Sequence, residues 1–538
     1  MALLISNVSV PSTEEEAARL LSRLLGIKPP QLQSVRLIRK SLDARPHPPV
    51  WRGNYQVELD PALEQRILAR RVPNVRAWTE RDGGRFGVED TTPARAPWSA
   101  GRVIVVGAGP AGMFAALFLA ESGVPVLLLD RGGAVDARVG AVNGFWRRKL
   151  PLDTENNLLF GEGGAGTFSD GKIYTRRRDA EIGYVLRRFV DCGAKPEILE
   201  EGWAHLGTDK VREILPVFRE RLRAHGAEVR FDARVVGLVV EGGRCVGVRL
   251  ADGAEERGAA VLVAPGHSAR DTVQMLVEAG APAVARPVAI GARVEHPQTL
   301  IDRARYGVDA RGDLPASSYR LAWHPPTGAK ARTFCMCPGG MVVPAMHQPG
   351  QVVVNGMSFA AQRGLWANSA VIVEVDVSAY GGAGPLAGYR WQAEIERRAF
   401  ELGGGDFTAP AQRVEDLLAG VGSAELPRTS YPLGVKATDL REVLPAVVTD
   451  AMVLALRQFD REVPGFVGPE AVLIAPETRT TSPLAFLRDA ACQSAGLPGL
   501  WPVGEGAGFG GGIVSCAIDG LRAARGLMDV APGVRAAS

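Results

Sequence analysis

The stretch VIVVGAGPAGMFAALFLAESGVPVLLLD, residues 103–130, decides the fold. Its first four residues form a short apolar run of the kind that is buried on both faces in a parallel sheet. A glycine-rich turn follows at once, and Met113 to Glu121 has a helical pattern. A second apolar run, 126–129, ends in Asp130. This order predicts a strand–turn–helix–strand unit, in which the glycines divide an uncharged run that would otherwise suggest a membrane span.

Each part of this unit has a physical task in binding a dinucleotide. Gly107 permits the tight turn, Gly109 lets the backbone approach a pyrophosphate, and Gly112 allows the helix to pack closely on the strand. The helix N-terminus offers free N–H groups and the positive end of its dipole to phosphates. Asp130 can accept hydrogen bonds from ribose hydroxyls, and an acid there disfavours a 2′-phosphate. The turn alone allows either NAD or FAD.

Three later segments favour FAD. Residues 232–236 are expected on a strand at the place where flavoproteins commonly cover the adenine. Residues 261–266 form an apolar strand that enters a turn of small residues. Residues 500–506 form a strand that brings Glu505 to where it can bind ribityl hydroxyls. The turn at 510–513 then opens a helix whose N–H groups can stabilise negative charge on a reduced flavin.

These segments, together with a glycine-rich loop at 161–172, define the predicted FAD site. Its residues are Gly107, Gly109, Pro110, Ala111, Gly112, Asp130, Arg131, Arg138, Gly163, Gly164, Val235, Ala264, Gly266, Gly504, Glu505, Gly511, Gly512 and Ile513. The sequence has no second GxGxxG followed by a helix and an acid, so we expect no separate NAD(P)H domain. NAD(P)H is expected only as a transient electron donor at the flavin, and no metal site is predicted.

The 538 residues are too many for one compact core, and the pattern suggests an α/β protein in three parts. Residues 1–95 predict a small α+β module of the ferredoxin-like kind. Residues 99–285 and 476–538 predict the two pieces of a doubly wound, Rossmann-like FAD-binding domain. Residues 286–475 are rich in short strands, glycines and prolines, and they predict an inserted, mainly β substrate domain. A linker is expected at 91–97.

Six longer motifs, spread over nearly the whole chain, carry a resemblance to a known family. They are SLDAR at 41–45, GEGGAGTFSDGK at 161–172, CMCPGG at 335–340, NGMS at 355–358, RTTSP at 479–483 and GEGAGFGGGI at 504–513. With them the chain resembles the bacterial FAD-dependent dehydrogenases, a family of NAD(P)/FAD-dependent oxidoreductases. The resemblance implies FAD and an oxidoreductase activity, and it implies no particular substrate. Flavoprotein monooxygenases and a tRNA-modifying flavoprotein share the plan of the FAD domain.

Two candidate groups for chemistry beside the flavin lie in these motifs. Residues 166–172 have the spacing of a P-loop, but Ile173 stands where Ser or Thr must bind magnesium. Lys172 is therefore expected near the flavin or a substrate anion, or else in a structural salt bridge. Cys335 lies one residue from Cys337, a spacing that allows a strained disulfide, a metal site, or two small side chains packed beside the substrate cavity.

Three further candidates come from residue type and position. His267 directly follows the turn at Gly266 and is a candidate acid–base group. Arg332 and Arg479 can each bind a carboxylate with two parallel hydrogen bonds, or each can form an ordinary structural ion pair.

Composition limits the partners and the compartment. The 62 basic and 59 acidic residues give a net charge of +3, which provides no strong field for nucleic acid or an acidic membrane. The six cysteines are scattered and the first residues do not resemble a signal peptide, so we expect a cytoplasmic protein without a membrane partner. No oligomeric state is predicted.

The predicted function is hydride transfer between a small organic substrate and flavin N5. One alternative is a flavin monooxygenase. Another is an FAD-stabilised RNA-binding or tRNA-modifying protein, with the N-terminal module and Arg176–Arg178 as the contact surface.

Overall fold

The computed structural model describes residues 2–79, 93, 95, 97–175, 179–201, 203–381 and 384–530. Contacts along the chain divide it into two compact units. One unit combines Met1–Thr92 with Ile173–His205, and the other combines Pro93–Lys172 with Leu206–Ser538. This grouping joins the N-terminal residues to a distant segment that the predicted domain limits assigned to the FAD-binding domain. The domain limits given above stay predictions.

Two of the sequence predictions fall on parts of the chain that the structure does not describe. Most of the linker expected at 91–97 lies outside the described residues, and so does Arg176–Arg178, the basic run of the RNA-binding alternative.

The smaller unit is built on a four-stranded sheet with the order β2-β3-β1-β4. Its elements are β1 (Ala2–Ser9), α1 (Glu14–Leu25), β2 (Ser34–Asp43), β3 (Val50–Glu58), α2 (Pro61–Ala69), β4 (Val75–Ala77) and, from the later segment, α6 (Glu181–Asp191). The pairs are antiparallel, which makes this the ferredoxin-like βαββαβ arrangement predicted from the sequence. Alternate residues such as Leu3, Ile5 and Val57 are buried against Leu21 and Leu25 of α1.

A five-stranded parallel sheet forms the centre of the larger unit, in the order β22-β11-β5-β6-β7. Its strands are β5 (Val103–Val106), β6 (Val126–Leu129), β7 (Glu228–Arg230), β11 (Ala260–Val263) and β22 (Leu500–Pro502). The associated helices are α4 (Pro110–Glu121), α5 (Val135–Trp146), α7 (Thr208–Ala224), α8 (Arg270–Glu278) and α14 (Ile513–Val530). All residues of β5, β6 and β11 are buried, as the continuous apolar runs predicted, and the doubly wound parallel sheet is confirmed.

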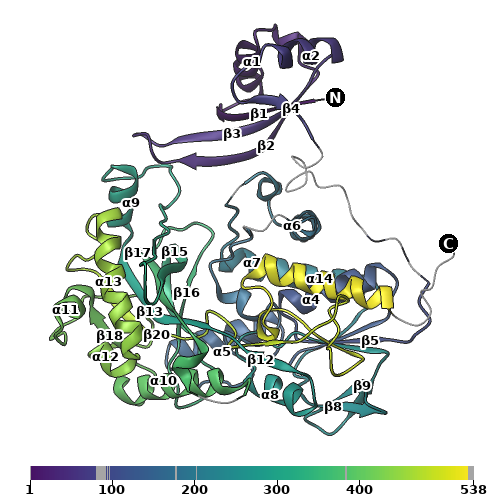
Figure 1. The fold of residues 1–538 in the computed structure, drawn as a ribbon, viewed down its shortest axis with the longest axis vertical. Helices are drawn as coiled ribbons and strands as arrows, with labels where there is room; N and C mark the ends of the chain where they lie inside the picture. The colour runs from purple at the N-terminus through teal and green to yellow at the C-terminus, as the bar shows by residue number, and fades with distance from the viewer. Residues whose placement is uncertain are drawn as a thin grey trace. The chain divides into compact units, whose positions relative to one another are not determined.

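Helices α4 and α14 lie side by side on this sheet (Figure 1). The contact is close because a glycine, Gly520, faces the backbone of Ala111, and a Cβ at that position would collide with the Ala111 carbonyl oxygen. The two predicted helix starts, one after the fingerprint turn and one after Gly512, are thereby fixed relative to each other.

One strand expectation needs correction. The sequence alternates from Glu228 to Val240, but the strand is interrupted after Arg230, and β8 (Val235–Glu241) starts a separate antiparallel sheet with β9 (Arg244–Leu250) and β10 (Glu255–Arg257). In the interruption Asp232 adopts a positive φ of 54°, and its N–H donates to the carbonyl oxygen of Gly132 at 3.1 Å. The segment at 232–236 is therefore mainly a turn, because its amide groups bond to the end of β6.

A largely antiparallel sheet of eight strands forms the rest of the larger unit. Its strands are β13 (Val288–Pro297), β14 (Ala322–Trp323), β15 (Ala331–Pro344), β16 (Val354–Ser358), β17 (Trp366–Val375), β18 (Ala409–Arg413), β19 (Val435–Ala437) and β20 (Val472–Glu477). Its helices are α9 (Gln298–Tyr306), α10 (Ala387–Gly403), α11 (Val414–Ala419), α12 (Leu440–Val443) and α13 (Ala446–Glu462). A separate two-stranded antiparallel ribbon pairs β12 (Ala283–Ala285) with β21 (Leu484–Phe486).

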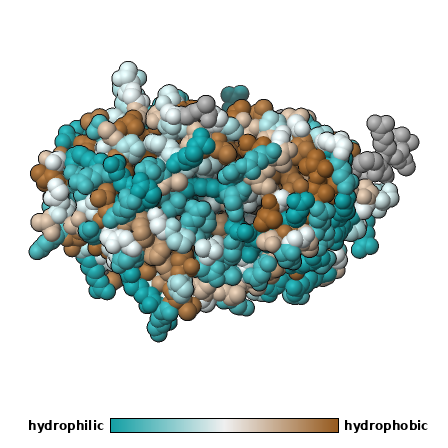
Figure 2. Space-filling model, turned by 90° about the horizontal axis from the view of Figure 1, so that it is seen from below, coloured by the Kyte–Doolittle hydropathy of each residue, from teal (hydrophilic) through white to brown (hydrophobic). Residues whose placement is uncertain are grey.

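Hydrophobic and hydrophilic residues are interspersed on the face of the molecule that Figure 2 shows. Among the described residues, no helix combines the length and the apolar character needed to cross a bilayer.

Candidate active site

The fingerprint turn is tight on one side and open on the other. Gly107 has a φ of 103°, and a Cβ there would collide with the carbonyl oxygen of Ala264 at the end of β11. A Cβ on Gly112 would collide with the carbonyl oxygen of Gly107. By contrast, the nearest atom to a Cβ on Gly109 would be the Cα of Gly164, at 3.9 Å. No side chain caps the start of α4, so its first N–H groups can serve a phosphate.

Asp130 organises this turn through the main chain. Its carboxylate accepts hydrogen bonds from the N–H groups of Ala108 at 2.6 Å, Gly132 at 2.9 Å and Gly161 at 2.8 Å. Burial raises the pKa of Asp130, while the three N–H donors act in the opposite direction. The side chain thus fixes both the fingerprint turn and the glycine-rich loop, and its predicted contact with a ribose stays a prediction.

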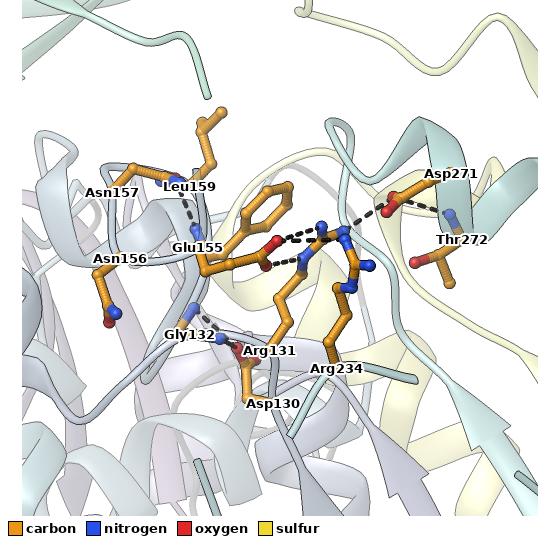
Figure 3. A network of polar contacts seen from close by, with 12 residues as sticks. Asp130, Arg131, Gly132, Glu155, Asn156, Asn157, Leu159, Arg234, Asp271 and Thr272 are labelled. Carbon is orange, nitrogen blue, oxygen red and sulfur yellow. Dashed lines mark hydrogen bonds and ion pairs between the residues drawn. The ribbon is translucent and has the colours of Figure 1, made fainter. Parts of the chain in front are cut away.

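Arg131 is held by acids on two other segments. Its guanidinium binds Glu155 at 2.5 Å and Asp271 at 2.8 Å (Figure 3). It also lies 4.3 Å from the ring centroid of Phe160. Glu155 is shared with Arg234 at 3.5 Å. Arg131 therefore connects the end of β6 to the 153–157 loop and to α8, with its donors used inside the protein.

Arg138 is fully buried and shapes the glycine-rich loop. Its guanidinium donates to the carbonyl oxygens of Asn157 at 3.1 Å, Leu158 at 2.9 Å and Gly164 at 3.0 Å, to that of Glu162, and to the hydroxyl of Thr167 at 2.9 Å. Burial lowers the pKa of Arg138 to about 9. These contacts assign the side chain a positioning role, and a direct bond to the cofactor stays a prediction.

The glycine-rich loop meets two other predicted segments. The N–H of Gly163 donates to the carbonyl oxygen of Ala108 at 2.8 Å, and a Cβ on Gly164 would lie 3.0 Å from the Cα of Gly109. A Cβ on Gly166 would lie 3.3 Å from Ile513, the first residue of α14. The structure therefore brings together the fingerprint turn, the glycine-rich loop and the start of α14. Val235 lies deeper, at the start of β8, in the core that covers the parallel sheet.

The ends of β11 and β22 complete this arrangement. Gly506 packs on the carbonyl oxygen of Gly266 with no room for a Cβ, and the N–H of Gly504 donates to Asp519 of α14 at 2.8 Å. On the other side, a Cβ on Gly266, Gly511 or Gly512 would have no atom within 4 Å. The two strand ends are thus closely packed on each other, and the glycines beside them leave space in which a ligand can approach the backbone.

Glu505 is the unpaired acid of this region. Within the described part of the chain, its carboxyl group has no hydrogen-bond or ion-pair partner. Burial, with a contribution from the charge of Cys335, raises the pKa of Glu505 to about 8. A carboxyl group held in such a recess suits a ligand that supplies hydroxyl donors, because an unsatisfied buried acid is costly. The uncapped helix start, the open glycine faces and Glu505 together fit the FAD that the sequence predicts.

A second cluster surrounds Cys335. The ammonium of Lys172 pairs with Asp170 at 2.6 Å and donates to the carbonyl oxygen of Met336, while Ser358 donates to the other oxygen of Asp170. Cys335 itself has a φ of 45°, unusual for a residue with a side chain. Lys172 thus forms the salt bridge that was one of its two expected roles, and it does so beside Cys335.

Arg293, on β13, also contacts the backbone at Cys335. It is fully buried, binds Glu477 at 2.6 Å and Asn368 at 2.6 Å, and donates to the carbonyl oxygen of Cys335 at 3.2 and 3.3 Å. One of its nitrogens lies 3.7 Å from the sulfur of Cys337. Burial opposes its charge, but Glu477 and the two thiols raise the pKa of Arg293.

A third cluster surrounds Arg479, and its charged groups are paired with one another. Glu396, buried on α10, accepts from Arg479 at 2.8 and 3.0 Å and from Arg270 at 2.7 and 2.9 Å. Arg479 also donates to Ser268 at 3.1 Å and to Gln351 at 3.2 Å, and it contacts His347 at 3.1 Å. The carboxylate that Arg479 binds is therefore one of the protein's own.

His267 and Arg332 stand apart from the Cys335 cluster. The ring of His267 contacts the hydroxyl of Ser268 at 2.6 Å, and burial lowers the pKa of His267 to about 4. A neutral imidazole is thus expected near pH 7. Arg332 forms a partly exposed ion pair with Glu374 across β15 and β17. Neither contact brings these side chains to Glu505 or Cys335. Among the described residues, no group of acids, histidines and cysteines forms a metal site.

Comparisons with known proteins agree with this geometry. A family model described as "FAD dependent oxidoreductase" matches residues 102–264, and one described as "FAD-dependent protein, C-terminal domain-like" matches residues 287–480. The chain is 35% identical to an uncharacterized protein of Clostridium beijerinckii, over 98% of this chain and 99% of that protein. The chain belongs to the FAD-dependent oxidoreductases.

Two more distant relatives match parts of this FAD-dependent oxidoreductase. It is 31% identical to aklavinone 12-hydroxylase of Streptomyces purpurascens over 25% of this chain and 26% of that protein. Among solved structures, a geranylgeranyl bacteriochlorophyll reductase-like protein of Thermoplasma acidophilum is 14% identical, with a TM-score of 0.35, over 79% of this chain and 77% of that chain. The fold itself follows from the sheet topology.

Several polar residues at the site of this FAD-dependent oxidoreductase escaped the sequence analysis. Arg293 directly follows the uncharged run 288–292 within one strand, and a charge placed there was a usable signal of a buried, paired side chain. Asp170 lies two residues before Lys172, inside a motif that was already recognised. Glu396, on an ordinary amphipathic helix, carries no comparable signal.

Proposed function

We propose that the protein transfers a hydride between a small organic substrate and N5 of FAD. The observation that carries this proposal is the start of α14. Gly511 and Gly512 are open there on the side a Cβ would take, and the carboxyl group of Glu505 has no partner among the described residues. When FAD is bound, it supplies the hydride-accepting ring.

The starts of α4 and α14, the turn around Gly109 and the carboxyl group of Glu505 form the predicted FAD cradle. Each part of this cradle has a role in the proposal. The N–H groups at the start of α4 and the turn around Gly109 bind the pyrophosphate, and Glu505 binds ribityl hydroxyls. The N–H groups at the start of α14 stabilise negative charge that develops on the pyrimidine side of the ring. Lys172, beside Cys335, supplies positive charge where an anionic substrate can be oriented.

The donor and the compartment extend the same proposal. NAD(P)H would serve as a transient electron donor to the bound flavin, since the sequence contains one dinucleotide fingerprint. We place the reaction in the cytoplasm, because all six cysteines are free thiols.

The test begins with the purified protein and its flavin content. Heat-released flavin should be FAD, at about one per chain, and anaerobic addition of metabolites should identify a substrate that bleaches the flavin absorbance. Glu505→Gln should bind FAD more weakly, and Glu278→Gln, an exposed acid on α8, serves as the matched control. A protein that binds no added FAD would refute the proposal.

A monooxygenase is the second candidate, favoured by the partial match to aklavinone 12-hydroxylase. Stopped-flow mixing of the reduced protein and substrate with oxygen separates the two. A delayed second phase of reoxidation with a hydroxylated product supports the monooxygenase, and single-phase reoxidation without such a product supports hydride transfer.

A further inference from the structure

Strand β15 contains an irregularity centred on its two cysteines. Its pairing with β17 shifts in register between Phe334 and Cys337 and again between Cys337 and Gly340. The positive φ of Cys335 lies in the first shift. A bulge of this kind re-aims a side chain and is over-represented beside active sites. The backbone at Cys335 is therefore not that of a regular extended strand.

Two cations, the buried Arg293 and the partly exposed Lys172, hold the backbone of the bulge in place. Arg293 donates twice to the carbonyl oxygen of Cys335, and Lys172 donates to that of Met336. A non-glycine residue in the left-handed region costs of the order of 1–3 kcal/mol, so it persists where surrounding contacts fix it. Both cations lie far from residues 335–337 in the sequence. Several long-range contacts therefore stabilise the conformation of this motif.

The two cysteines contact each other and occupy unequal environments. The thiol of Cys337 donates to the carbonyl oxygen of Cys335 at 3.3 Å, and the two side chains influence each other's pKa. The hydrogen bond from Cys337, aided by Lys172 and Arg293, lowers the pKa of Cys335 despite burial. Burial and the neighbouring sulfur raise the pKa of Cys337. One thiolate beside one thiol is the arrangement that forms a disulfide most readily.

The two sulfurs differ in accessibility and in their effect on Glu505. Cys335 is partly accessible, whereas Cys337 is fully buried. The charge of Cys335 acts on the carboxyl group of Glu505, which places its sulfur near the end of β22 and the start of α14.

We propose that Cys335 and Cys337 form a dithiol redox centre that exchanges two electrons with the flavin. This inference rests on the proposed function, because it requires FAD in the cradle beside Glu505. It assigns the CMC motif an activity of its own, and it makes a thiol or disulfide compound of small size the class of molecule able to exchange with Cys335.

The step balances without an additional oxidant. The Cys335 thiolate and the Cys337 thiol are oxidised, a bond forms between the two sulfurs, and the S–H bond of Cys337 breaks. Two electrons and that one proton pass to oxidised FAD, which becomes the FADH⁻ anion. The reverse step opens the disulfide and restores one thiolate and one thiol. Lys172 stabilises the thiolate in both directions through its positive charge.

An anaerobic titration of the FAD-loaded protein tests the proposal. After oxidation with diamide and removal of the reagent, the wild-type protein should consume twice as much dithionite per flavin as Cys337→Ser. Peptide mapping should show a Cys335–Cys337 disulfide before the titration and two alkylatable thiols after it. Cys492→Ser is the matched control, since Cys492 is also partly accessible with a positive φ, and it should behave as wild type.

A spectroscopic readout tests whether the thiolate lies against the flavin. The reduced dithiol with oxidised FAD should show a long-wavelength charge-transfer absorbance that Cys335→Ser loses and Cys337→Ser keeps. Equal dithionite consumption in the wild type and Cys337→Ser, with FAD bound in both, would overturn the dithiol centre alone. Failure of the protein to bind FAD would overturn this inference together with the proposed function.

Discussion

Replacement of Asp130 tests how the fingerprint turn is held. Its carboxylate accepts three main-chain N–H groups from three separate segments, at 2.6, 2.9 and 2.8 Å. Asp130→Asn keeps an oxygen at the position that serves Gly132 and Gly161, and it places an amide NH2 against the N–H of Ala108. Asp130→Ala removes all three acceptors.

The structure sets the scale of the two effects. A buried donor left without a partner costs about 1–3 kcal/mol. Asp130→Asn leaves one such donor without a partner. The free energy of FAD binding should therefore become less favourable by about 1.4 kcal/mol, which is about tenfold in affinity. Asp130→Ala leaves three, and relaxation of the loops limits the loss, so we expect about 3–5 kcal/mol and at least about a hundredfold weaker binding.

Fluorescence titration of the apoprotein with FAD measures this directly, because flavin emission changes on binding. The matched control is Asp252→Asn, an exposed aspartate that accepts one main-chain N–H from Ala254 at 2.9 Å in a surface turn. Its affinity should equal that of the wild type. A folded Asp130→Asn protein that binds FAD within twofold of the wild type would refute the reasoning.

Three other predictions follow from the described contacts. Glu505→Gln should weaken FAD binding about 10–100-fold, because hydrogen bonds to a charged group contribute about 1.5–3 kcal/mol. Since the pKa of Glu505 is about 8, binding should release a proton and wild-type affinity should rise with pH up to about 8; a pH-independent affinity in calorimetric titrations would contradict this. Arg138→Lys should cost about 3 kcal/mol in thermal or urea unfolding, since an ammonium cannot reach all the carbonyl oxygens that the guanidinium serves, whereas Arg332→Lys should cost less than about 1 kcal/mol. Glu396→Gln should cost about 3–5 kcal/mol at pH 7, because it leaves two buried arginines uncompensated. The pKa of Glu396 is about 2, so the stability of the wild type relative to Glu396→Gln should decrease as the pH falls from about 4.5 towards 2. If the difference in the free energy of unfolding at pH 3 equals that at pH 7, the assignment is wrong.

The parts of the fold that the sequence predicted are those with local signals. The βαβ unit at 103–130 follows from two continuous apolar runs and a turn that glycine must occupy, and the ferredoxin-like unit follows from the order of its strand and helix patterns. The alternation between Glu228 and Val240 was misleading, because the break at Asp232 depends on hydrogen bonds to Gly132, about a hundred residues earlier.

The site was predicted less completely, because its polar groups find their partners across the fold. The sequence identified Lys172 and Cys335 as candidates, but the bulge that joins them depends on Arg293 and on a register shift between β15 and β17. The role expected of Arg479 left two alternatives open, and Glu396, its partner, lies on a helix whose amphipathic pattern does not identify that acid as buried. Local patterns do not encode such pairings.

The composition of the smaller unit has a consequence for how the protein is made. Its sheet includes Lys40, whose N–H donates to the carbonyl oxygen of Glu200 at 3.0 Å and whose ammonium binds Glu201 at 3.2 Å. On the ribosome, the first 92 residues emerge on the order of ten seconds before that partner segment does. The nascent N-terminal sheet therefore has its four strands but lacks its contacts with residues 173–205 while the fingerprint helix is already being synthesised, and a gene fusion or split placed after residue 95 would separate the two segments of one compact unit.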